Sequence, residues 1–263
     1  MSDDTNKNEL VTLGGLTEAD FIKAAQGNRG FTKDETVIPF TRIMQPQSPQ
    51  VGTAPWITPG VFLNLATSKV NKELLCVMVD VQWNYTEWTA PAGQGGQFVK
   101  DWGEFAKGWQ ELCDKDQWEA YQPVTKEGHS ILRARHFYLL TIDEIGDYER
   151  TIFPFAATSL AVAKQWSAMV QYAPKVKTSQ GMLTPAHFYY TYVLSLEEQK
   201  NNKGRWFKPK VSANIENNKY VSVLEMPNGK AIWEASEKMR DGLQAGEFRA
   251  SNPVDEEGSD NTF

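Results

Sequence analysis

The stretch Leu74-Leu-Cys-Val-Met-Val-Asp-Val-Gln-Trp-Asn-Tyr85 decides the fold class. Every second residue from Leu75 onward is apolar, and Asp80, Gln82 and Asn84 lie between the apolar positions. A period of two is typical of a β-strand with one buried face. We therefore predict a strand over residues 74–85 whose buried face consists of Leu75, Val77, Val79, Val81, Trp83 and Tyr85.

Other segments extend this pattern along the chain. We expect strands at residues 37–44, 130–142, 150–155, 186–196, 204–212 and 220–225. A period of 3.6 predicts helices at residues 17–27, 101–121, 158–172 and 230–243. This order does not alternate strand and helix, so it argues against a doubly wound nucleotide-binding sheet. It favours a mainly β (α+β) fold, an antiparallel barrel or sandwich with peripheral helices.

Three regions follow from composition. Residues 1–30 form an N-terminal arm with a short helix, and residues 31–248 form one domain with inserted helices. Residues 249–263 form an acidic tail whose last residues contain four carboxylates, one large apolar residue and no cation after residue 249. Such a segment buries too little apolar surface to offset the entropy of ordering, so we expect it to be disordered.

The charge of the chain is unevenly distributed. The 263 residues carry a net charge of −6, yet residues 160–230 contain 10 basic and 4 acidic residues. A basic middle in an acidic protein can bind a polyanion locally. The two cysteines are too few for a disulfide scaffold, and no signal peptide or membrane-spanning segment is evident. We expect a cytoplasmic protein that does not bind a membrane.

Catalytic motifs are not evident. The three histidines, His129, His136 and His187, are not at metal-ligand spacing from cysteines or carboxylates. The sequence has no phosphate-binding glycine motif and no nucleophile elbow. The acidic residues between 143 and 149 are read as a solvated loop. We therefore expect a protein that is not an enzyme and that has no cofactor and no metal.

Cations and aromatic rings are interleaved in Gly204-Arg205-Trp206-Phe207-Lys208-Pro209-Lys210. Alternation places Trp206, Lys208 and Lys210 on one face of the predicted strand. Single-stranded nucleic acids need cations for phosphates and flat rings for exposed bases. The expected DNA-binding residues are Arg133, Arg135, Phe137, Arg205, Trp206, Lys208 and Lys210, with Tyr85, Trp88, Lys175 and Lys177 as lesser candidates. The alternative is that the rings belong to the core and the lysines are simply solvated. Trp83, Trp102, Trp109 and Trp166 lie on apolar stripes and are assigned to the core.

The last nine residues are Asp255-Glu-Glu-Gly-Ser-Asp-Asn-Thr-Phe263. An acidic C-terminus ending in Phe resembles that of phage-encoded single-stranded DNA-binding proteins. The resemblance implies an OB-like barrel that binds the strand and a tail that recruits replication or recombination proteins. The partner-binding residues that it implies are Asp255, Glu256, Glu257, Asp260 and Phe263. The usual bacterial ending has an Ile-Pro-Phe tip, which this chain lacks, so the partner stays open.

The sequence thus predicts a protein that binds single-stranded DNA, without strong sequence preference, during phage replication or recombination in the host cytoplasm. A homo-oligomer is an open alternative. A different class is a phage structural or transcription-regulatory protein that binds a protein partner instead of DNA. An enzyme of nucleotide metabolism is a third alternative.

Overall fold

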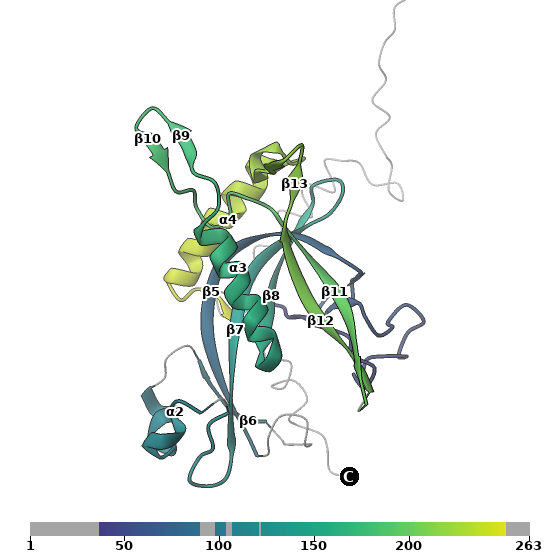
Figure 1. Cartoon of the computed structure of the whole chain (residues 1–263), viewed down its shortest axis with the longest axis vertical. Coiled ribbons are helices and arrows are strands. Elements are labelled where there is room, and N and C mark those ends of the chain that lie inside the picture. The colour runs from purple at the N-terminus through teal and green to yellow at the C-terminus, as the bar shows by residue number, and fades with distance from the viewer. Residues whose placement is uncertain (1–36, 90–97, 104–106, 121, 203, 251–263) are drawn as a thin grey trace, which may run out of the picture.

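A computed structural model describes residues 37–89, 98–103, 107–120, 122–202 and 204–250. Its largest sheet is antiparallel with the strand order β12–β11–β5–β7–β8, and β6 pairs with the far end of β5 (Figure 1). The six strands are β5 (Leu74–Trp88), β6 (Phe98–Gly103), β7 (Ser130–Ile142), β8 (Tyr148–Ala156), β11 (Tyr192–Asn201) and β12 (Gly204–Ala213). The prediction of a mainly β, antiparallel fold is confirmed.

The sheet is open in the part of the chain that the structure describes. β12 and β8 stand at the two ends of the strand order. The OB-like barrel therefore stays a prediction. Within the same described residues, no helix is long and apolar enough to cross a membrane.

A β-bulge divides the long strand β5. Met78 pairs with Leu139 and Asp80 pairs with Tyr138, so Val79 is an extra residue in the ladder. A bulge reverses the side to which the later residues of a strand point. The predicted single face is therefore wrong: Leu75, Val77 and Val79 pack on one side of the sheet, whereas Val81 packs on the other.

Each side of the sheet has its own helix and its own apolar core. Helix α3 (Leu160–Gln171) lies across one side, where Phe137, Phe155 and Trp166 have no exposed surface (Figure 1). Helix α4 (Gly229–Gln244) covers the other side and contributes Ile232 and Met239 to the second core. Both helices were predicted from their apolar period, and both are confirmed.

The far ends of β5 and β7 form a small lobe with helix α2 (Lys107–Leu112) and the 3-10 turn η2 (Lys115–Gln117). Tyr85, Trp109, Cys113 and Ile131 form its apolar centre. The predicted helix over residues 101–121 is wrong at both ends, because residues 98–103 pair with β5 as strand β6 and α2 ends at Leu112. The edge of a long strand offers backbone hydrogen bonds that outweigh a weak helical pattern.

Five short strands form two smaller sheets, one of β2, β3 and β4 and one of β1 and β15. They are β1 (Val37–Ile38), β2 (Thr41–Ile43), β3 (Phe62–Asn64), β4 (Val70–Asn71) and β15 (Arg249–Ala250). β15 pairs in parallel with β1. The first two residues of the predicted tail, 249 and 250, thus pair as a strand, and the division into arm, domain and tail stays a prediction. The predicted arm, residues 1–30, and residues 251–263 lie outside the described residues.

The chain after α3 differs from the prediction in two places. Strand β11 begins at Tyr192 rather than at residue 186, and Phe188 turns away to contact Trp233 of α4 at 4.9 Å between ring centroids. Residues 223–225 form the 3-10 turn η4 (Val223–Glu225) instead of a strand. A capping box explains this turn, since the Glu225 carboxylate accepts a hydrogen bond from the Ser222 backbone N–H at 2.9 Å.

Two hairpins complete the fold. Strands β9 (Val176–Thr178) and β10 (Gly181–Leu183) form a hairpin that extends from the body beyond α3 and α4 (Figure 1). Strands β13 (Ile215–Glu216) and β14 (Lys219–Tyr220) form the other hairpin. Asn217 and Asn218 make its turn with positive φ angles of 49° and 61°, a conformation that Asn tolerates.

Candidate nucleic-acid interface

Strand β12 has one core-facing side and one outer side. Val211 is buried in the core beneath α3, and Phe207 lies on the same side of the strand. Trp206, Lys208 and Lys210 therefore share the opposite side, as the alternation predicted. Lys210 is exposed, and Trp206 and Lys208 are half-buried. A ring and two ammonium groups thus lie in line on one side of the β11–β12 hairpin.

The β11–β12 hairpin is basic although the whole protein is acidic. Residues 192–213 contain five basic and two acidic residues. Arg205 forms an exposed ion pair with Glu198 at 3.7 Å on the core-facing side of the ribbon. Exposed ion pairs contribute little to stability, so exchanging this one for a phosphate contact costs little. The hairpin has the charge and the rings that an extended polyanion with exposed bases requires.

A loop over residues 45–60 contacts the backbone edge of β12 that does not pair with β11. The Gln45 side-chain amide donates a hydrogen bond to the Phe207 carbonyl, and its oxygen accepts one from the Phe207 N–H, both at 2.8 Å. Gly60 lies beneath the Phe207 ring, where an added Cβ would come within 2.6 Å of Cε1. These contacts occupy backbone groups that an edge strand would otherwise leave open.

The same loop presents Trp56, whose side chain is 63% exposed. Sequence reasoning missed this residue. Trp56 lies in a proline-rich segment with no apolar stripe, whereas a core Trp usually lies on such a stripe. This pattern could have indicated an exposed ring. The loop meets β12 at Phe207, which lies on the side of the strand opposite to Trp206, so these contacts do not place Trp56 on the surface formed by Trp206, Lys208 and Lys210.

The cations of β7 have a different environment. The Arg135 guanidinium lies 5.4 Å from the Trp83 ring centroid and 5.8 Å from that of Phe137. Its Nη1 donates to Ser167 Oγ of α3 at 3.3 Å. Burial lowers the pKa of Arg135 from its usual value, because a charged group loses hydration there. Arg133 donates to the Ala120 carbonyl at 2.8 Å. Both cations therefore hold neighbouring segments onto the sheet.

Two predicted rings belong to the core. Phe137 is fully buried and stacks on Trp166 at 4.8 Å between centroids. Tyr85 is buried and stacks on Trp109 at 4.9 Å, and burial raises the pKa of its hydroxyl, partly opposed by Arg133. A ring without accessible surface cannot stack on a base. These two assignments are corrected, because α3 and α2 cover the residues.

The remaining residues predicted to bind DNA do not form one surface. Arg133 and Arg135 lie on the α3 side of the sheet, whereas Trp206, Lys208 and Lys210 face the other side. Trp88 is half-buried in the small lobe, where its Nε1 donates to Thr86 Oγ1 at 3.0 Å. Lys175 and Lys177 are exposed on the β9–β10 hairpin. The tail residues Asp255, Glu256, Glu257, Asp260 and Phe263 lie outside the described residues.

Two of the three histidines, His129 and His136, pack against other side chains of the fold. His129 Nδ1 lies 2.7 Å from Glu87 Oε1, and the other oxygen of this buried carboxylate accepts from Trp102 Nε1 at 3.0 Å. His136 is buried beside Phe40. Across the described part of the chain, no three His, Cys, Asp or Glu side chains gather as metal ligands would. The contact of His129 with Glu87 was not predicted, since 42 residues separate the two in sequence.

Comparison with known proteins gives one match. A family model described as the Pam3 phage gp34-like protein matches residues 11–249. No curated protein and no solved structure matches. The match covers most of the 263 residues and supports a phage origin. The chain therefore belongs to the Pam3 phage gp34-like protein family.

Proposed function

We propose that this protein binds single-stranded DNA along the outer side of the β11–β12 hairpin. One observation carries the proposal: Trp206, Lys208 and Lys210 lie in line on one side of a hairpin with a net charge of +3, in a protein of net charge −6.

The chemistry of an extended strand fits this arrangement. Residues two apart in a β-strand lie about 6.6 Å from each other, so the ring and the ammonium groups follow the strand at a regular spacing. Ammonium groups attract phosphates independently of sequence, and base stacking on one ring contributes about 1–3 kcal/mol. We therefore expect affinity with little sequence preference.

The family match and the residues of the C-terminus support a biological setting for this proposal. A phage protein that binds single strands acts in DNA replication or recombination in the host cytoplasm. Its acidic Phe-ended terminus recruits replication or recombination proteins, with Phe263 and the neighbouring carboxylates entering a basic pocket on the partner. This assignment to the tail rests on the resemblance and on residue chemistry.

Titration with oligo-dT tests the DNA-binding proposal. We expect quenching of tryptophan fluorescence and an affinity that falls as salt rises, with a negative slope on a log–log plot. The variant Lys208→Glu/Lys210→Glu should lose most of this affinity. The matched control is Lys164→Glu/Lys238→Glu, which makes the same charge change at exposed positions of α3 and α4.

Equal losses in both variants would show that only net charge matters and would remove the hairpin from the proposal. Absence of quenching at low salt would favour the alternative, a phage structural or transcription-regulatory protein that binds a protein partner. Deletion of residues 255–263 then separates two roles of the tail. If the tail competes with DNA, deletion tightens oligo-dT binding. If it only recruits partners, affinity is unchanged.

A further inference from the structure

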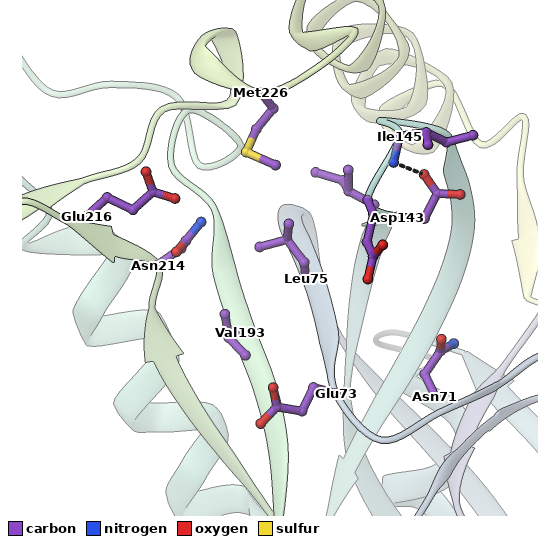
Figure 2. A pocket seen from close by; sticks show the side chains of 11 residues that line it. Asn71, Glu73, Leu75, Asp143, Ile145, Val193, Asn214, Glu216 and Met226 are labelled. Atoms are coloured by element: carbon purple, nitrogen blue, oxygen red, sulfur yellow. Dashed lines mark hydrogen bonds between the residues drawn. The ribbon is translucent and has the colours of Figure 1, made fainter.

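A pocket of about 770 Å³ opens where β5, β7 and β11 meet the chain between β12 and α4. Its apolar lining comprises Leu75, Ile142, Ile145, Val193 and Met226. Figure 2 shows Leu75 and Val193 beside each other and the Met226 thioether directed toward the same space. This volume lies in the range of cavities that hold a ligand or several side chains.

Carboxylates surround this apolar lining. They belong to Glu73, Asp143, Glu144 and Glu216, and the pocket has no lysine or arginine in its lining. Asp143 Oδ1 accepts backbone hydrogen bonds from Ile145 and Asp147, as Figure 2 shows for the former. Within the described residues, no cation forms an ion pair with any of the four. The pocket therefore favours an occupant with an apolar body and cationic groups, and it repels the phosphates of DNA.

The β9–β10 hairpin has the complementary composition. Lys175 and Lys177 are exposed, and residues 172–187 contain no acidic residue. Met182 and Leu183 are also exposed, at 57% and 46%, although large apolar side chains favour burial. In the register of the hairpin, Met182 lies opposite Lys177, so an apolar and a cationic side chain occupy the same face.

The position of the hairpin also points to an external contact. It extends away from the sheet beyond α3 and α4 (Figure 1). A two-stranded ribbon is only marginally stable in water on its own, and exposed apolar side chains make it less soluble. A surface that covers Met182 and Leu183 and pairs with the two lysines would remove both costs.

We propose that the β9–β10 hairpin of one molecule docks into the acidic pocket of a second copy of this chain. The charges are complementary: the two lysines meet the four carboxylates, while Met182, which shares a face of the hairpin with Lys177, meets the apolar lining. Reciprocal docking closes a dimer, and one-way docking continues into a longer chain, because the two surfaces are different. The contact uses neither Trp206 nor Lys208, so it does not depend on the proposed DNA interface.

Sedimentation equilibrium on the full-length protein tests the contact by charge reversal. We expect an average mass above the 29.7 kDa of one chain that rises with concentration and falls as salt is added. The hairpin variant Lys175→Glu/Lys177→Glu and the pocket variant Glu73→Lys/Glu216→Lys should each sediment as monomers, since like charges then meet. The control Lys164→Glu/Lys238→Glu should associate as the unaltered protein does.

The decisive measurement combines the two charge reversals, so that opposite charges meet again in the proposed contact. An equimolar mixture of the hairpin and pocket variants should associate again, and so should one chain that carries all four substitutions. A circular-dichroism melt shows whether each variant is folded, and the mixture makes the test independent of any loss of stability. A monomeric unaltered protein, or a mixture that stays monomeric, overturns the proposal. So does a hairpin variant that associates normally but loses oligo-dT affinity, because the lysines would then serve DNA.

Discussion

Strands β7 and β12 carry the same alternation of cations and rings but use it differently. In β7, Arg135 lies against Trp83 and Phe137 beneath α3, and Phe137 has no exposed surface. In β12, Trp206, Lys208 and Lys210 lie on the side of the hairpin that does not face the α3 core. Alternation therefore fixes which side chains of a strand share a face, whereas the packing of a helix decides whether that face is core or surface.

The prediction with the largest expected effect removes the α3 ring that packs on Phe137 of β7. Trp166 is fully buried and stacks on Phe137, so Trp166→Ala should cost about 3–5 kcal/mol of unfolding free energy, measured in urea. Trp166→Phe keeps a ring in the stack and should cost less. Trp56→Ala, at a mostly exposed ring, should cost under about 0.5 kcal/mol. Similar losses for Trp166→Ala and Trp56→Ala would contradict the assignment of this face to the core.

A second test uses the pH dependence of the buried part of β7. Burial, with a smaller effect of the Arg42 charge, lowers the pKa of His136 from 6.5 to about 4. The unfolded chain therefore binds the extra proton first as the pH falls, and stability is lost between about pH 6.5 and pH 4. From pH 7 to pH 5, this residue should remove about 2 kcal/mol of unfolding free energy.

The variant His136→Gln isolates that contribution. Urea midpoints at pH 7 and pH 5 should differ less in the variant than in the unaltered protein, whatever stability the variant has at pH 7. An equal pH dependence in both proteins would show that His136 is hydrated or accessible in the folded state. His187→Gln is the control, because His187 is exposed.

Much of the fold could be predicted from periodicity, and the misses have local causes. The pattern of β5 predicted the strand but not the bulge at Val79, because the extra residue is as apolar as its neighbours. Residues 101–103 were predicted as the start of a helix, but they pair with β5, whose free edge supplies backbone hydrogen-bond partners. For the candidate site, Trp206, Lys208 and Lys210 were placed on one face correctly, whereas the burial of Phe137 depends on α3, which is distant in sequence.

The exposed face of β12 is tested by removing its ring. Trp206→Ala should weaken oligo-dT binding by about 1 kcal/mol, or roughly fivefold, because one stacking surface is lost. The urea midpoint should change little, since Trp206 is outside the two main cores. The matched control is Tyr172→Ala, which removes an 80% exposed ring at the end of α3. Equal affinities for Trp206→Ala and the unaltered protein would exclude this ring from binding.

The smallest expected change in oligo-dT affinity compares the two sides of the β11–β12 hairpin. Glu197 lies opposite Lys208, and Glu198 lies opposite Phe207, so these neighbouring carboxylates point to opposite sides of one ribbon. If DNA follows the outer side, Glu197→Gln removes a charge that repels its phosphates and should tighten oligo-dT binding about twofold at low salt. Glu198→Gln makes the same change on the other side and should have a smaller effect. Both carboxylates are exposed, so neither change should alter the free energy of unfolding by more than about 0.5 kcal/mol. A larger gain from Glu198→Gln would place the strand on the side of Arg205 and of the α3 core, and the contrast between β7 and β12 would then lose its functional meaning.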